Sequence, residues 1–393
     1  MDLPEEIVIN IIARLPMKSV VRFKSVCREW KSFTDSKFFR DLNESSSNST
    51  SCSNWSILSG SIRSGLEEMK LDLPRESRHG NTSFASCFTL GKKNYKFKEI
   101  RVVACNDGLV LLRLEPDDDE EDMTIRYYIG NPVLPQWIQL PPPPPPPLLF
   151  PNKSLYIDSS LVTRMHNRTL LGYKVVLVLV KWDCPPKYNF LIFSSDTGEW
   201  SEQEPSCRVP FETVSLNGKL HWLDHRRVTL CDFFSHDDDQ VRAIRLPAGV
   251  QIERHPYHPH KNMICTTSQG YFVLINVGLM EDDVNKSYNV RIWRLKSDSW
   301  SWEKAWDINL ASLGLGRSCV PMAINVFDID IIYLWDLDTK CFLACNLRTN
   351  TKSYGARKDG YPFDDTLGFE TWPRLSQFVP SLQVVPTLEH KFI

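Results

Sequence analysis

From about residue 100 onward, short hydrophobic strands alternate with polar turns, and this repeated pattern limits the possible fold more than any other feature. Apolar and polar residues alternate with a period of two, which is typical of β-strands. A unit of similar composition recurs with irregular spacing. Each unit begins with a turn and a hydrophobic strand, continues with a second strand that contains aromatic residues, and ends with a polar turn followed by another aromatic residue. These units begin near Asp107-Gly108, Val175, Asn217-Gly218, Gly270 and Ile324.

Repeats of roughly 40 to 60 residues made of strands predict blades arranged around an axis, because one four-stranded sheet leaves two apolar faces that need neighbours. The predicted fold class is therefore α+β multidomain, with a small three-helix segment followed by a mainly antiparallel all-β domain, a β-propeller. An antiparallel β-sandwich is the alternative. The irregular spacing of the units does not fix the number of blades.

The first forty residues have a helical pattern instead. Pro4 sets the backbone for a helix start, and acidic residues follow it in the first turn. Ile7, Ile11 and Leu15 recur every four residues, and Pro16 ends the pattern.

Two further short helices are expected after this break, one carrying Val20 and Phe23 and one running through Cys27, Trp30 and Phe33. Three such helices bury little surface, and below about 40 residues a lone core is rarely sufficient. We therefore expect part of their apolar surface to be covered either by the rest of the chain or by a partner.

The residues of this segment resemble the F-box in the form common among plant F-box proteins. The resemblance covers residues 1 to about 40 and rests on both Leu-Pro pairs, the Arg-Phe step, the Val-Cys-Arg pattern and the tryptophan. It implies a three-helix module that docks a Skp-type adaptor, which bridges to a cullin–RING ubiquitin ligase. The positions implied to contact the adaptor are Leu3, Pro4, Ile7, Ile11, Leu15, Pro16, Val20, Phe23, Val26, Cys27 and Trp30.

The β region resembles, more diffusely, the kelch-like F-box-associated region that follows plant F-boxes. The matching pieces are Cys105 to Val110, Gly130-Asn131-Pro132 with Trp137, and Asn217 to Trp222. The paired glycines of a full kelch repeat are missing. The resemblance implies a domain that recognises a target protein.

The predicted domains are the adaptor-docking helices at 1–42, a flexible Ser/Asn-rich linker at 43–54 and the β domain at 55–393. Residues 55–58 fit a strand, whereas residues 62–71 have weak helical character. An acidic run at 117–122 predicts a solvated hairpin tip, with calcium binding as the alternative. A run of prolines at 141–147 predicts a polyproline II rod, which serves as a spacer or as a ligand for an aromatic groove.

The composition argues against several functional classes. The formal net charge is −2, and no basic stripe interleaved with aromatic residues is present, so we expect neither nucleic acid nor an anionic membrane as a partner. The eleven cysteines are scattered without paired zinc spacing. The longest apolar run is too short to cross a bilayer, and the acidic N-terminus does not resemble a secretory signal. We expect a cytoplasmic or nuclear protein.

Candidate catalytic and metal sites are weak. His255, His258 and His260 lie in a proline-broken loop, where a surface loop is a better interpretation than a metal clamp. The segment Asp336 to Thr339 lies between two apolar strands and predicts a turn. Cys27 follows Val26 on an apolar stripe, which favours packing over a reactive thiolate. No phosphate-binding glycine loop, nucleophile elbow or zinc-protease helix is present, and we expect no cofactor or metal.

The tryptophans of the β region are expected to pack mainly between blades, with a minority at a recognition surface where loops cluster; they are Trp222, Trp293, Trp300, Trp302, Trp306 and Trp335. The leading hypothesis is a non-catalytic substrate-recognition subunit of an SCF-type cullin–RING ubiquitin ligase. The alternatives are a propeller enzyme or ligand-binding module with a structural helical cap, and an adaptor-bound scaffold that assembles no ligase.

Overall fold

A computed structural model gives the architecture of the chain. The structure describes residues 4–15, 17–24, 26–36, 38–39, 42, 55–59, 62–63, 97–116, 124–134, 136–144, 156–181, 187–204, 211–224, 226–235, 241–250, 262–279, 287–316, 319–339, 341–354 and 375–386. The predicted linker at 43–54, the acidic run at 117–122 and the three histidines of residues 251–261 lie outside these described residues.

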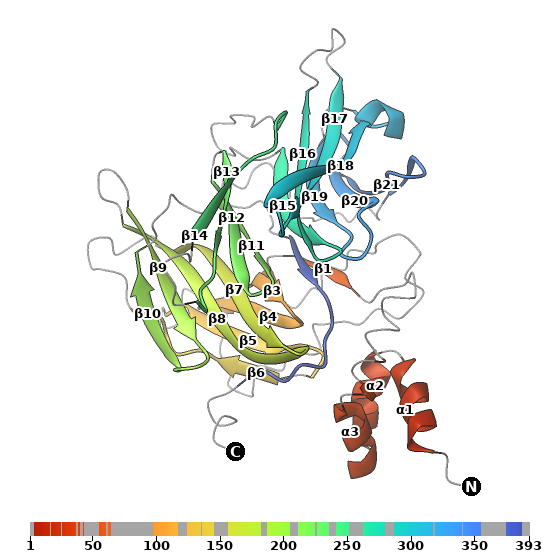
Figure 1. Ribbon diagram of the computed structural model, residues 1–393. Coiled ribbons are helices and arrows are strands. Elements are labelled where there is room, and N and C mark those ends of the chain that lie inside the picture. The colour runs from red at the N-terminus through yellow and green to blue at the C-terminus, as the bar shows by residue number, and fades with distance from the viewer. Residues whose placement is uncertain are drawn as a thin grey trace.

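The strands form a β-propeller with five antiparallel blades, each containing four strands in chain order (Figure 1). The propeller prediction is confirmed, and the sandwich alternative is wrong. Blade 1 contains β3 (Phe97–Asn106), β4 (Leu109–Pro116), β5 (Arg126–Asn131) and β6 (Gln136–Gln139), and β2 (Ile62–Arg63) is added beside β3. Blade 2 contains β7 (Tyr156–His166), β8 (Thr169–Lys181), β9 (Lys187–Ser194) and β10 (Glu199–Gln203). Blade 3 contains β11 (Phe211–Leu216), β12 (Lys219–Asp224), β13 (Arg227–Cys231) and β14 (Val241–Arg245).

The last two blades follow the same plan. Blade 4 contains β15 (Met263–Ser268), β16 (Tyr271–Leu279), β17 (Tyr288–Lys296) and β18 (Ser301–Asn309), followed by the 3-10 helix η2 (Leu310–Leu313). Blade 5 contains β19 (Cys319–Ile324), β20 (Ile331–Asp336), β21 (Cys341–Asn346) and β22 (Thr351–Tyr354). The first four units found in the sequence correspond to the second, third and fourth strands of a blade, whereas the last begins at Ile324, the end of the first strand β19. The first strands of blades 1 to 4 were missed because the turn residues that mark a unit come after them.

The ring is closed by the two ends of the β region. β1 (Ser56–Ser59) pairs antiparallel with β23 (Leu375–Phe378), and β23 lies between the innermost strands β3 and β19. The side-chain amide of Gln377 donates to the carbonyl oxygens of Ile324 (2.7 Å) and Thr267 (3.0 Å). The strand expected at 55–58 is confirmed, whereas Ile62 and Arg63, expected at the start of a weak helix, form a strand.

A hydrophobic cluster fills every junction around the ring. Separate clusters join blades 1 and 2, 2 and 3, 3 and 4, and 4 and 5, and the β1–β23 pair packs on blade 5 at Ile57 and on blade 1 at Phe378. Apolar residues on both faces of the strands therefore contact neighbours, as expected for blades. All six tryptophans named above belong to these clusters, which confirms that they pack between blades.

The two ends of the propeller differ in their connections. At one end, called the turn end here, two-residue turns join the first and second strands of blades 1 to 4, as at Asp107-Gly108 and Gln269-Gly270. At the other, called the loop end here, the second strand of each blade ends and the third begins, as β16 and β17 do at the top of Figure 1, and each fourth strand ends before the next blade. The three helices lie at the bottom of that view, so they are on the side of the turn end.

Candidate functional site

The helical segment consists of α1 (Glu5–Ala13), α2 (Met17–Lys24) and α3 (Arg28–Asp35), which confirms the three expected helices. α1 begins after Pro4 and has Glu5 and Glu6 in its first turn, where negative charge favours the helix dipole. Ile9, Ile12, Ala13, Val20 and Phe39 form a small buried core. The helices therefore hold together around one face of α1.

The opposite face of α1 is apolar and uncovered. Ile7 is 46% exposed and Ile11 is 52% exposed, although both are large hydrophobic residues. They are four residues apart and therefore lie on the same side of the helix. The expected stripe of Ile7, Ile11 and Leu15 is split by the structure, because Leu15 packs on the internal core whereas the two isoleucines face outward.

A second group lies where α2 meets α3. The rings of Phe23 and Trp30 are in contact, with centroids 4.5 Å apart, and both side chains are half-buried. Val26, between the helices, is 64% exposed. The sulfur of Cys27 accepts a hydrogen bond from the backbone N–H of Trp30 at 3.4 Å, so this exposed cysteine caps α3. The expectation that Cys27 packs on an apolar stripe is wrong, because its side chain is exposed and caps the first turn of α3.

The structure separates the predicted contact residues into three sets. Pro4, Ile7, Ile11, Val26 and Cys27 are exposed, and Leu15, Phe23 and Trp30 are half-buried. Val20 is fully buried and supports the surface from beneath. Leu3 and Pro16 lie outside the described residues.

Sequence reasoning missed an exposed aromatic residue after α3. Phe38 is 47% exposed, whereas the adjacent Phe39 is fully buried. Two adjacent phenylalanines in the sequence could have indicated this exposed residue, because neighbouring residues at a helix end point to different sides and only one of them can enter the core. Phe39 anchors the chain, and Phe38 adds apolar surface at the end of the helical segment.

The segment after β23, residues 379–386, connects the helices to the propeller. Leu382 packs against the core of the helical segment. On either side of it, the side-chain amide of Asn131 donates to the carbonyl oxygens of Ser381 (2.9 Å) and Gln383 (2.7 Å). Ser381 also lies against Gly108 in the first turn of blade 1. The helices are thus held at the turn end of blade 1.

Polar contacts join the inner strands at the turn end. The amide of Asn106 donates to the hydroxyls of Thr163 (2.7 Å) and Ser215 (2.9 Å), which links blades 1, 2 and 3. Thr163 donates in turn to the carboxylate of Asp107. Burial raises the pKa of Asp107, and the hydrogen bond from Thr163 opposes that change. This network is a structural tie between blades.

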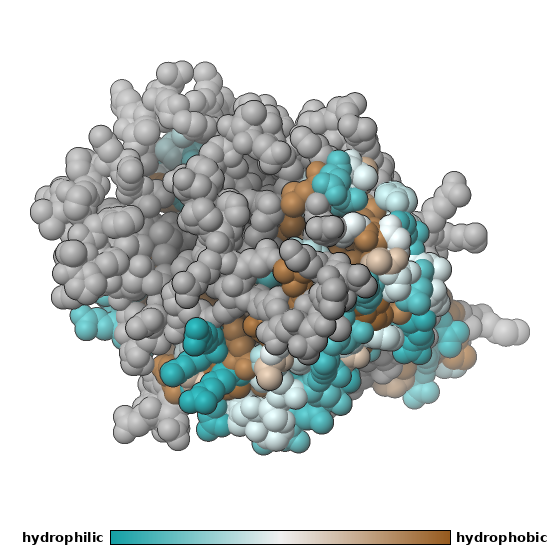
Figure 2. Space-filling view, turned by 90° about the horizontal axis from the view of Figure 1, so that it is seen from above, coloured by the Kyte–Doolittle hydropathy of each residue, from teal (hydrophilic) through white to brown (hydrophobic). Residues whose placement is uncertain are grey.

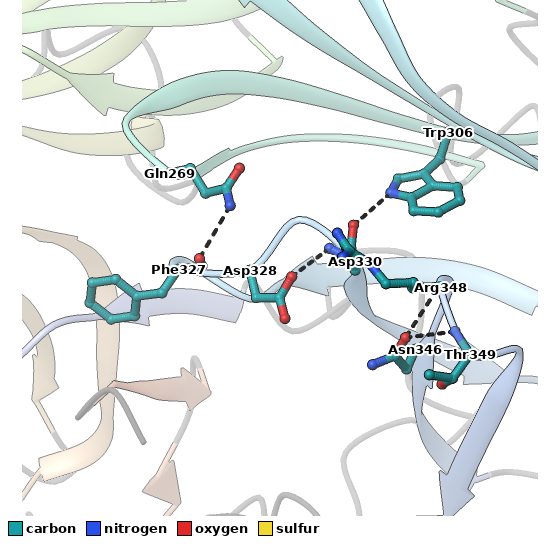
Figure 3. Close-up of polar contacts among 8 residues, drawn as sticks. All are labelled: Gln269, Trp306, Phe327, Asp328, Asp330, Asn346, Arg348 and Thr349. Atoms are coloured by element: carbon teal, nitrogen blue, oxygen red, sulfur yellow. Dashed lines mark hydrogen bonds and ion pairs between the residues drawn. The ribbon is translucent and has the colours of Figure 1, made fainter. Parts of the chain in front are cut away.

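The junction of blades 4 and 5 contains a second polar cluster (Figure 3). The buried carboxylate of Asp330 accepts from the indole N–H of Trp306 (3.1 Å) and from Nε of Arg348 (2.6 Å). Asn346 accepts the backbone N–H groups of Arg348 (3.0 Å) and Thr349 (3.1 Å). Because each of these carboxylate and amide oxygens is engaged, the cluster fixes the turns of blade 5.

Other candidate sites have structural explanations or lie outside the described residues. The carboxylate of Asp336 accepts the backbone N–H of Asp338 at 3.0 Å and the hydroxyl of Thr339 at 2.8 Å, so this segment is the predicted turn. Within the described residues, no group of three or more His, Cys, Asp or Glu side chains is arranged to hold a metal ion. No described helix is long and apolar enough to cross a membrane.

The loop end is shown from above in Figure 2, where the described residues present both hydrophobic and hydrophilic side chains. The buried side chain of Arg291 donates there to the carbonyl oxygens of Gly249 (3.2 Å), after β14, and Leu279 (3.1 Å), at the end of β16. Two connections from neighbouring blades are thus tied to one guanidinium group.

Comparisons with known proteins agree on the family. Residues 1–42 match the family model for the F-box domain, and residues 53–369 match the model described as F-box protein At3g26010-like, beta-propeller. The putative F-box protein At3g23950 of Arabidopsis thaliana is 33% identical over 90% of this chain and 84% of its own length. The putative F-box/kelch-repeat protein At1g15680 of the same plant is 32% identical over 92% of this chain and 85% of its length.

Solved structures resemble the chain only distantly. The β-propeller domain of the Trilobed protease from Pyrococcus furiosus has 11% identity and a TM-score of 0.32, over 61% of this chain and 66% of that one. The structure of YjhT has 12% identity and a TM-score of 0.33, over 64% of this chain and 82% of that one.

Proposed function

The chain belongs to the F-box proteins with an At3g26010-like β-propeller, and from that premise we propose that it is the substrate-recognition subunit of an SCF-type cullin–RING ubiquitin ligase. The helical segment binds a Skp-type adaptor, and the propeller binds a target protein. The chain itself makes and breaks no bond.

The observation that carries this proposal is the uncovered apolar face of α1. Ile7 and Ile11 remain about half exposed, although the helix buries its other face in the core of the same segment. Scattered hydrophobic residues on a surface are ordinary, but two on one helix face, together with an exposed Val26 between α2 and α3, fit a surface that a partner covers. The family match over residues 1–42 supports a Skp-type adaptor as that partner.

The mechanism is the proximity of two bound partners. A target held by the propeller has its lysines close to a ubiquitin-charged enzyme carried by the same assembly, which raises their effective concentration. The helices lie at the turn end, so the loop end is on the side away from the adaptor. We assign target binding to the loop end for this reason, and we place the protein in the cytoplasm or nucleus.

Co-purification with a Skp-type adaptor tests the proposal. Ile7→Asp/Ile11→Asp places two charges in the adaptor contact without entering the internal core, and we expect adaptor binding to fall by about tenfold or more. Leu171→Asp is the matched control, because Leu171 is 43% exposed on β8 of the propeller. Undiminished binding by the double variant would overturn the proposal.

The remaining alternatives give different results. A cullin retained together with the adaptor favours the ligase, whereas adaptor binding without a cullin favours a scaffold. A preparation that stays monodisperse without adaptor and converts a small substrate would favour a propeller enzyme.

A further inference from the structure

The outer part of blade 3 carries three arginines whose side chains make no contact with another side chain within the described part of the chain. Arg226 precedes β13, Arg227 begins it and Arg245 ends β14, and all three side chains are exposed. No ion pair, side-chain hydrogen bond or ring contact joins any of them to another part of the described chain. We call these three residues the blade 3 arginine cluster.

This cluster differs from the rest of the described propeller. Arg113, Arg164, Arg291, Arg294 and Arg348 each lie within 4.0 Å of a carboxylate oxygen. Further arginines make other contacts, such as Arg242, whose guanidinium group lies 4.9 Å from the ring centre of Trp300. The unpartnered arginines are therefore concentrated on one edge of one blade.

The strand register brings the positive charges together. Arg227 and Arg245 are directly opposite each other in the antiparallel pair of β13 and β14. Opposite residues of such a pair point to the same face with Cβ atoms about 4.5–5.5 Å apart, and like charges at that position destabilise the sheet. The backbone N–H of Leu246 donates to the carbonyl of Arg226 at 3.0 Å, which keeps Arg226 beside the same strand ends. Asp224 is opposite Arg227 on β12, so three positive charges meet one negative charge in this region.

The cluster lies at the loop end of blade 3. The turn joining β12 to β13 connects a second strand to a third strand, and the end of β14 leads to the next blade. Both therefore belong to the loop end. On the same face of the blade, the pair Cys231 and Val241 packs against blade 2 near the turn end. Along these two strands the face thus changes from a buried apolar junction to exposed arginines.

We propose that the blade 3 arginine cluster binds an acidic segment of the target protein, and this inference rests on the proposed function. Arginine presents a planar fork of donors that matches the oxygens of carboxylates and phosphates. An anionic group placed between Arg227 and Arg245 offsets their repulsion and adds to the single negative charge of Asp224.

Binding of degenerate peptides to the full-length protein, co-purified with its adaptor, tests the inference. The probes are three fluorescent libraries of otherwise random twelve-residue peptides, with four fixed positions occupied by Glu, by phosphoserine or by Lys. We expect the wild-type protein to bind the Glu or phosphoserine library and not the Lys library. Arg227→Gln/Arg245→Gln should weaken that binding by about tenfold, with weaker binding at higher salt.

A matched control separates the site from the overall charge. Lys296→Gln/Lys304→Gln removes the same charge from blade 4, where the side chains are 45% and 53% exposed and form exposed ion pairs of small energetic value. Binding should persist in this control. The melting temperature of the arginine variant should equal or exceed that of the wild type, because the like-charge pair is removed.

Each result has one meaning. Equal binding of all three libraries, no binding of either anionic library, or unchanged binding by the arginine variant would overturn the inference. A difference between the Glu and phosphoserine libraries identifies the preferred anion. Adaptor co-purification is measured in the same preparations. Absence of the adaptor from the wild-type preparation would contradict the proposed function, whereas the peptide-binding results test only the role of the blade 3 arginine cluster.

Discussion

The indole N–H of Trp302 donates a hydrogen bond to the carbonyl oxygen of Arg245 at 2.7 Å, which joins the fourth strand of blade 4 to the fourth strand of blade 3. Trp200 repeats this relationship, since its N–H donates to the carbonyl oxygen of Pro141, just after blade 1, at 2.9 Å. The outer edge of the ring is therefore tied by tryptophans as well as by apolar packing.

Replacing Trp302 with Phe tests this tie. The substitution keeps an aromatic ring against the cluster between blades 3 and 4 but removes the donor. We expect the free energy of unfolding to fall by about 1 kcal/mol from the hydrogen bond, with a further loss from the smaller ring. Urea denaturation measures the change. Trp200→Phe should give a similar loss, and no change in either variant would contradict a stabilising role.

Gly108 provides a test of how the segment after β23 sits on blade 1. Both Gly108 and Gly270 have positive φ angles, 79° and 76°, so an alanine at either position costs about 1–2 kcal/mol. A Cβ at Gly108 would also lie 2.3 Å from Cβ of Ser381, whereas nothing lies within 4 Å of one at Gly270. Gly108→Ala should therefore lower the melting temperature more than Gly270→Ala, and Ser381→Gly should restore part of the difference.

His221 makes stability depend on pH. Its ring stacks on Phe272 of blade 4 with centroids 5.0 Å apart, and burial lowers its pKa to about 4 from an ordinary value of 6.5. Because the folded state favours the neutral ring, its contribution is complete above pH 6.5 and is lost as the pH falls toward 4. The loss is on the order of 3 kcal/mol.

Unfolding measured from pH 7 to pH 4 in His221→Phe checks this effect. The variant should lose less stability than the wild type over this range. Parallel curves for the two proteins would show that His221 is not responsible.

Leu382 is expected to hold the helical segment on the propeller. Leu382→Asp places a charge against the core formed by Ile9 and Phe39, so the helices should separate from the propeller while the blades stay folded. Hydrogen exchange of the α1 amides should become faster, and exchange in the blades should stay the same. Val384→Asp is the control, because Val384 is 48% exposed in the same segment. Equal exchange in both variants would contradict this role.

Part of the candidate site followed from local pattern alone. Pro4, the two glutamates after it and the spacing of Ile7 and Ile11 predicted α1 and its apolar character. Pattern did not show which apolar face would be covered. Ile9 and Ala13 were not singled out, yet they join the core, while Val20 was assigned to the contact and is buried. Which side of a short helix is buried depends on how it packs with its neighbours, and that is a property of the assembled segment.

By itself the sequence determined the three helices, the strand-rich units and their propeller arrangement, because helix starts, two-residue turns and short apolar strands are set by residues near each other in the chain. Only the tertiary structure decided that Ser56 pairs with Phe378 to close the ring, that Leu382 contacts the helices, and that Arg227 stands opposite Arg245. These contacts join residues far apart in the sequence or depend on strand register, and both arise when the blades pack around a common axis.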